Sequence, residues 1–110
     1  MKIWLDDVRP FPPEYGNDCL TVKSVMEAEQ IIPLLISRDG IDSIEFLDLD
    51  HDLGDYACKG GDGIELVKWL IENELFIPIR LHTMNPVGRA NMQALVDRYW
   101  PKVLTFEHDL

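Results

Sequence analysis

Three groups of polar, mostly titratable residues in this sequence directly follow short apolar stretches. They are Asp6 and Asp7 after residues 2–5, Asp50, His51 and Asp52 after residues 44–49, and His82, Thr83 and Asn85 at the end of residues 79–82. Carboxylates that converge on one point repel one another, and the usual relief is protonation of one of them or a bound hard cation. These residue types therefore predict a divalent-metal site.

Four carboxylates are candidate metal ligands, namely Asp6, Asp7, Asp50 and Asp52. Oxygen ligands favour magnesium or manganese. Zinc is less expected because it prefers nitrogen and sulfur, although the neighbouring histidines keep that option open. His51 and His82 are the candidates for general acid and base, since histidine exchanges protons near neutral pH.

A helix predicted to begin at Asn85 and Pro86 adds a candidate anion site. The first turn of a helix leaves backbone N–H groups unpaired, and these bind anions. Gly88 and Arg89 lie in this turn, and Arg9 lies in a proline-rich stretch after the first acidic pair. Either arginine offers a bidentate grip on a phosphate that a metal also polarises.

The apolar stretches are predicted β-strands that alternate with helices along most of the chain. Strands are expected at 2–5, 20–22, 44–49, 79–82 and 103–106, and helices at 25–37, 63–75 and 86–100. This alternation favours a mainly parallel sheet sandwiched by helices. Ligands of such sheets bind outside the carboxyl ends of the strands, which is where the polar groups would meet.

Local signals refine the expected helices. Ser24 with Glu27, and Asp62 with Glu65, have the spacing of capping boxes at helix starts. Pro33 lies inside the first helix and should kink or split it.

Composition limits the class of protein. A chain of 110 residues with 46% hydrophobic and 27% charged residues predicts one globular domain, residues 1–110. The formal net charge of −10 would repel long nucleic acid, but a bound cation would still admit a small phosphate or nucleotide ligand. Two widely spaced cysteines and the lack of a bilayer-length apolar run predict a cytoplasmic protein without a membrane partner.

Four motifs carry a resemblance that spans nearly the whole chain. They are LDDVRP at 5–10, LDHDLG at 49–54, GIELVKWL at 63–70 and LHTMNPVGRANM at 81–92. In this order they resemble the cyclic-phosphate processing receiver-like domain family, which is related to response-regulator receiver domains. The resemblance implies a receiver-like, flavodoxin-like α/β fold: a mainly parallel five-stranded sheet with helices on both faces, its first helix replaced by the proline-rich loop.

The resemblance also implies roles for individual residues. Asp6, Asp7 and Asp50 match the receiver residues that hold magnesium and accept phosphate, and Thr83 matches the hydroxyl residue after the fourth strand. No lysine follows the last expected strand, where residues 106–108 read Phe-Glu-His, which argues against ordinary phospho-relay signalling.

The implied reaction is metal-assisted opening of a small nucleotide-type cyclic phosphodiester. His51 or His82 would protonate the leaving oxygen, and either a metal-held water or Asp50 would attack phosphorus. An enzyme, a metal-dependent cyclic phosphodiester hydrolase, is therefore the leading hypothesis.

Other interpretations remain open at this point. The chain could be a non-catalytic receiver-like module that binds metal and phosphate or nucleotide as a regulator, or an interaction domain whose acidic edge docks a basic partner. Asp6 and Asp7 could only cap a turn, His82 could be a hydrogen-bonded core residue, and Asn85 could be only a helix cap. The sequence specifies neither the nucleotide nor the oligomeric state.

Overall fold

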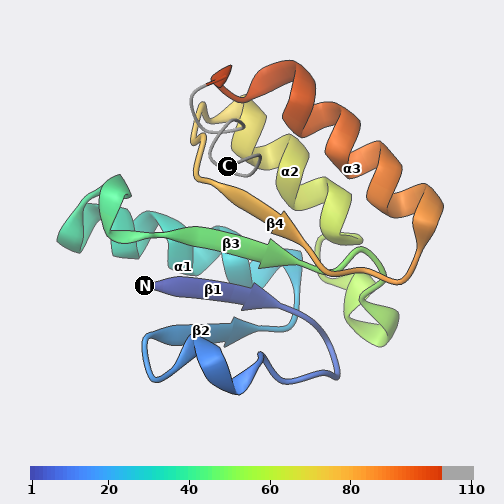
Figure 1. Ribbon diagram of the computed structural model, residues 1–110, viewed down its shortest axis with the longest axis horizontal. Coiled ribbons are helices and arrows are strands. Elements are labelled where there is room, and N and C mark those ends of the chain that lie inside the picture. Colours follow the sequence, from blue (N-terminus) through green and yellow to red (C-terminus); the bar gives the residue numbers. More distant parts are fainter. Residues whose placement is uncertain (103–110) are drawn as a thin grey trace.

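The computed structural model describes residues 1–102 of the protein (Figure 1). The strands are β1 (Lys2–Leu5), β2 (Cys19–Val22), β3 (Phe46–Leu49) and β4 (Ile79–Leu81). The α-helices are α1 (Val25–Asp39), α2 (Gly63–Glu72) and α3 (Pro86–Tyr99), and the 3₁₀ turns are η1 (Pro13–Tyr15), η2 (Ile41–Ser43) and η3 (Gly54–Cys58). The fifth strand predicted at 103–106 lies outside the described residues, as do Glu107 and His108.

The four described strands form one parallel sheet in the order β2-β1-β3-β4. This is the start of the 2-1-3-4-5 order of flavodoxin-like sheets. The predicted parallel α/β architecture is therefore confirmed, with four strands in the described part of the chain. Because all four strands run the same way, their carboxyl ends share one edge of the sheet, as Figure 1 shows.

The three helices cover one face of this sheet within residues 1–102. Ile3, Leu5, Leu47 and Leu49 alternate along β1 and β3, are fully buried, and share a core with apolar residues of all three helices. α1 packs on α2, and α2 packs on α3. In Figure 1, α1 lies behind β1 and β3.

The opposite face of the sheet is covered by the loop after β1 and not by the predicted helices. Trp4 and Phe46 point away from the helices and contact Tyr15 of η1 through ring edges, with centroid distances of 6.1 Å and 5.4 Å. The expectation of helices on both faces is therefore wrong for residues 1–102. The reason is the connection between β1 and β2, where prolines at 10, 12 and 13 prevent a helix and leave a loop. The predicted replacement of this helix by a proline-rich loop is confirmed.

Two predictions about the helices, the effect of Pro33 and the cap by Asp62, differ from the structure. Pro33 neither splits nor ends α1, which is continuous, because Pro33 lies on the exposed side, where water can bond the carbonyl that its missing N–H would have bonded. Asp62 precedes α2 but makes no side-chain cap; its Oδ1 instead accepts the N–H of Leu53 at 3.1 Å. By contrast, Ser24 caps α1 as predicted, accepting the N–H of Glu27.

None of the helices in the described part of the chain combines the length and the apolar character that crossing a bilayer would need.

Candidate functional site

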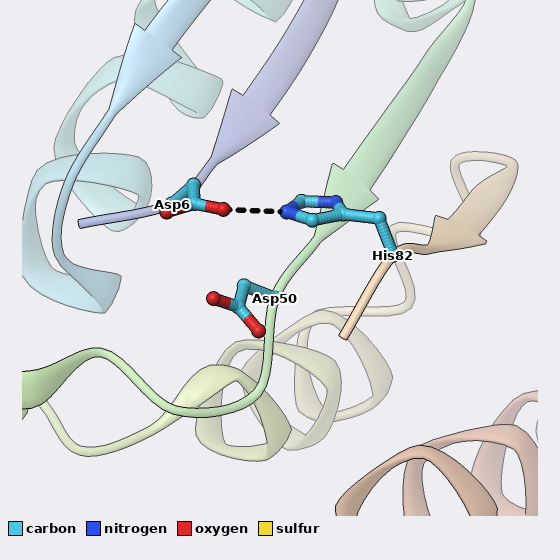
Figure 2. Close-up of side chains that lie close together, drawn as sticks. All are labelled: Asp6, Asp50 and His82. Atoms are coloured by element: carbon cyan, nitrogen blue, oxygen red, sulfur yellow. Dashed lines mark hydrogen bonds and ion pairs between the residues drawn. The ribbon is translucent and has the colours of Figure 1, made fainter. Parts of the chain in front are cut away.

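The carboxyl ends of three strands bring together two buried carboxylates and an imidazole. Asp6 follows β1, Asp50 follows β3 and His82 follows β4, and Figure 2 shows the three side chains facing a common space. One ligand atom from each lies within 4.8 Å of the others. Asp6 and Asp50 are 1% and 7% exposed, so water screens their mutual repulsion poorly.

Asp6 is held rigidly in its ionised form. Its Oδ1 accepts the backbone N–H groups of Val8 and Arg9 at 2.9 Å and 2.8 Å, and its Oδ2 lies 3.0 Å from Nε2 of His82. Burial alone would raise the pKa of Asp6, but these backbone hydrogen bonds and His82 outweigh it and lower the pKa. A carboxylate that stays ionised is what a cation ligand requires.

The donor set fits a hard divalent cation. The two carboxylates would suit magnesium or manganese, whereas an imidazole nitrogen is a ligand more typical of transition metals, so the set as a whole would favour manganese over magnesium. Asp50 keeps one oxygen, Oδ1, bonded to the N–H of His51 at 2.8 Å, which fixes its orientation beside Asp6. His82 therefore lies among the candidate ligands, whereas the sequence had suggested it mainly as an acid or base and as a ligand only for zinc.

A second group of potential ligands lies on the neighbouring loop. It consists of His51, Asp52 and Asp62, again with ligand atoms within 4.8 Å of one another. Nδ1 of His51 lies 2.7 Å from Oδ1 of Asp52, and this carboxylate also accepts from Nδ2 of Asn85 at 3.2 Å. The hydrogen bonds from His51 and Asn85 lower the pKa of Asp52. The structure thus places Asp52 with His51 and separates it from the Asp6 group.

The start of α3 packs directly on the ring of His51. A Cβ at Gly88 would lie 2.4 Å from Cγ of this imidazole, so only glycine permits the approach. Asn85 caps the helix by accepting the N–H of Gly88 at 3.0 Å. This N–H is therefore occupied by the cap, and the predicted anion site at the helix start has one donor fewer than expected.

The other predicted residues lie around these two groups. Asp7 belongs to neither group; its Oδ2 points at Gly54, 2.7 Å from where a Cβ would stand. Arg9 is exposed, with Nε 3.5 Å from Oδ2 of Asp6. Thr83 is buried, and its Oγ1 accepts the N–H of Asn85 at 3.1 Å. Arg89 is exposed on α3, and none of the described polar contacts involves its side chain.

Sequence reasoning missed Asp48, Tyr15 and Asp62. Asp48 is 4% exposed inside β3, and its Oδ1 lies 2.7 Å from Nδ1 of His82. The signal was a single charged residue in an otherwise apolar strand that ends at the site. Tyr15 gave no comparable signal, because its position in the proline-rich loop fixes no spacing to β3.

Comparison with known families agrees with the motifs and the fold. The family model for the cyclic-phosphate processing Receiver domain matches residues 1–98. No curated protein and no solved structure matches the chain. The matched range includes every strand and both groups of potential ligands found in the described part of the chain. The chain therefore belongs to the cyclic-phosphate processing Receiver domain family.

Proposed function

We propose that the protein is a metal-dependent hydrolase that opens a small nucleotide-type cyclic phosphodiester. Its family membership gives cyclic-phosphate processing as the general role. The observation that carries the specific reaction is the buried group of Asp6, Asp50 and His82 at the carboxyl edge of the sheet. Buried carboxylates this close to one another are costly unless a cation or a proton offsets their charge.

Asp6, Asp50 and His82 would hold the cation in this proposal. A bound magnesium or manganese ion would polarise a phosphoryl oxygen and offset the charge that develops in the transition state. Asp7 and Asp52 lie on the same edge of the sheet but outside this group, so we place them around the cation site and not among its ligands. Arg9 has its Nε 3.5 Å from Oδ2 of Asp6, and Arg89 lies in the first turn of α3, so we assign these two side chains to binding the substrate phosphate.

His51 is the better placed general acid. Its Nδ1 is engaged by Asp52, which leaves Nε2 as the nitrogen that can carry a proton to a substrate. Nε2 of His82, by contrast, lies against Asp6. In the reaction, water would add to phosphorus, one P–O bond of the ring would break, and a proton would pass from His51 to the oxygen that leaves; the proton that the attacking water loses would then restore His51. The product is an acyclic phosphomonoester.

Phosphorus NMR tests this proposal. The protein is incubated with nucleoside 2′,3′-cyclic phosphates and ADP-ribose cyclic phosphates in Mg²⁺ or Mn²⁺, and ring opening is followed with and without EDTA. We expect turnover that EDTA and Asp50→Asn abolish and that His51→Ala lowers by roughly 100-fold or more. The matched control is Asp42→Asn, an exposed aspartate of η2, which precedes β3 at the opposite edge of the sheet.

Two results would contradict the hydrolase. Turnover that survives EDTA or Asp50→Asn would remove the metal site from the reaction. Metal binding without ring opening on any substrate of the panel would instead identify a non-catalytic module that binds metal and phosphate.

A further inference from the structure

Asp48 is a buried carboxylate that the proposed chemistry does not use. It lies in β3 opposite Trp4 of β1 and Arg80 of β4, on the sheet face turned away from the helices. Its side chain is 5% exposed. A carboxylate this deeply buried is expensive unless partners satisfy it, so its contacts indicate what it does.

Both oxygens of Asp48 are bonded. Oδ1 lies 2.7 Å from Nδ1 of His82, and Oδ2 accepts the hydroxyl of Tyr15 at 2.6 Å. Burial and the bond to Asp48 raise the pKa of Tyr15, so its hydroxyl stays protonated and donates. The Tyr15 bond prevents the carboxylate from turning, and Asp48 therefore presents a fixed acceptor to the imidazole.

His82 is confined on three sides. Asp48 bonds Nδ1, Trp4 stacks on the ring with centroids 3.7 Å apart and planes 6° from parallel, and Nε2 lies 3.0 Å from Asp6. The stack prevents the ring from tilting, and the two carboxylates prevent it from flipping. Figure 2 shows the resulting direction, with a ring nitrogen facing Asp6 above Asp50.

We propose that Asp48 is a positioning residue that commits Nδ1 of His82 as an N–H donor and thereby makes Nε2 the nitrogen that serves the site. The reason is that a carboxylate can only accept, and Asp48 lies inside the sheet, on the far side of the ring from Asp6 and Asp50, where the proposed metal ion would not compete with Nδ1 for it. Nε2 also faces a carboxylate, Asp6, but it does so at the edge of the sheet, where a cation beside Asp6 and Asp50 would take the place of that hydrogen bond. Tyr15 acts on His82 only indirectly, by orienting Asp48. The catalytic consequence rests on the proposed hydrolase, whereas the choice of ring nitrogen does not.

Nitrogen NMR of the 15N-labelled, metal-free protein tests the choice directly. Long-range 1H–15N correlations of the His82 ring report which nitrogen carries the proton. We expect Nδ1 of the wild type to have the shift of a protonated nitrogen, and Mg²⁺ to move mainly Nε2. Asp48→Asn should shift Nδ1 towards the unprotonated value, because a carboxamide can also donate. Tyr15→Phe keeps the ring contacts, removes only the hydroxyl, and should give a smaller change of the same sign.

Steady-state kinetics gives a second readout. Loss of a partner that orients a metal ligand typically costs about 10–100-fold. We therefore expect Asp48→Asn to lower kcat by this amount with KM little changed, because Asp48 does not reach the substrate, and Tyr15→Phe to lower kcat by a few-fold. Asp42→Asn should match the wild type in both experiments.

The outcomes separate this proposal from the hydrolase. An unprotonated Nδ1 in the wild type overturns the role of Asp48 even if Asp48→Asn fails to fold, and so does a folded Asp48→Asn that keeps the wild-type ring shifts. A protonated Nδ1 that depends on Asp48, in a protein that opens no cyclic phosphate, would sustain the positioning of His82 and refute the hydrolase alone.

Discussion

Adjacent aspartates at the end of β1 have different surroundings. Asp6 is buried and bonded by two backbone N–H groups, whereas Asp7 is half-buried and points at Gly54. The sequence treats the two alike, since both have the position and chemistry of a metal ligand. Only the course of the loop after β1 distinguishes them, because the N–H groups of Val8 and Arg9 fold back onto Asp6.

We predict that the stability difference between the wild type and Asp6→Asn, measured in EDTA, depends on pH. The folded state lowers the pKa of Asp6, so its contribution is fully present above the ordinary aspartate range and is lost as pH falls through the lower, folded value. We expect the wild type to be more stable by about 1–3 kcal/mol near neutral pH. The difference should shrink below about pH 4.

Urea unfolding at several pH values measures this difference. The control is Asp42→Asn, an exposed aspartate distant from the site, which should follow the wild type throughout. A stability difference that grows as the solution becomes more acidic would show that the ionised form of Asp6 destabilises the fold.

The start of α2 is in direct contact with the loop after β3. The N–H of Gly63 bonds the carbonyl of His51 at 2.7 Å, and a Cβ at Gly63 would lie 2.0 Å from the carbonyl oxygen of Asp50. The first residue of the helix thus lies directly against the backbone that carries two site residues. A displacement of this helix start must move Asp50 and His51 together.

We therefore predict that Gly63→Ala lowers both stability and metal affinity. The added methyl group must displace the Asp50 backbone, and overpacking of this kind typically costs about 1–3 kcal/mol. Thermal unfolding and Mg²⁺ titration measure the two effects. Lys68→Ala, on the exposed side of the same helix, is the control and should change neither. Unchanged metal affinity in a destabilised Gly63→Ala would show that the loop yields without moving Asp50.

The elements were largely predictable, whereas several contacts between them were not. Short apolar stretches that end in polar residues identified the described strands and placed Asp6, Asp50 and His82 at one edge, because parallel strands share their carboxyl ends. The bond between Asp48 and Tyr15 joins residues 33 positions apart across a proline-rich loop. Its existence depends on where that loop crosses the sheet, which no periodicity encodes. The role of Asp62 was missed because its spacing to Glu65 also suits a capping box.

The whole domain is acidic, including the edge of the sheet where the strands end. The formal net charge is −10, and the carboxyl edge of the sheet carries buried carboxylates in an already acidic chain.

Helices on both faces of the sheet were expected from the alternation of strands and helices, but the handedness of each crossover decides which face its helix covers. β2 to β3 and β3 to β4 advance in the same direction across the sheet, so right-handed crossovers place α1 and α2 on the same side.

We predict that Mg²⁺ or Mn²⁺ stabilises the folded protein. A cation at about 100 times its Kd adds about 2.7 kcal/mol, which corresponds to roughly 10 °C in Tm for a domain of this size. Calorimetry at fixed ionic strength measures the change, with NaCl as the control for general screening of the negative charge. Asp50→Asn should lose the specific part and keep the screening part. Equal shifts from NaCl and MgCl₂ would mean that the acidic edge is only a diffuse counter-ion surface.

The stack of Trp4 on His82 has an optical consequence. Imidazole in contact with indole quenches its fluorescence, and the quenching changes with the charge and the position of the imidazole. Of the three tryptophans, Trp69 and Trp100 stack on no histidine among residues 1–102, so contact quenching by His82 is confined to Trp4. We therefore expect the fluorescence of Trp4 to report, without any label, a change in the charge or position of His82 such as a bound cation or ligand would cause.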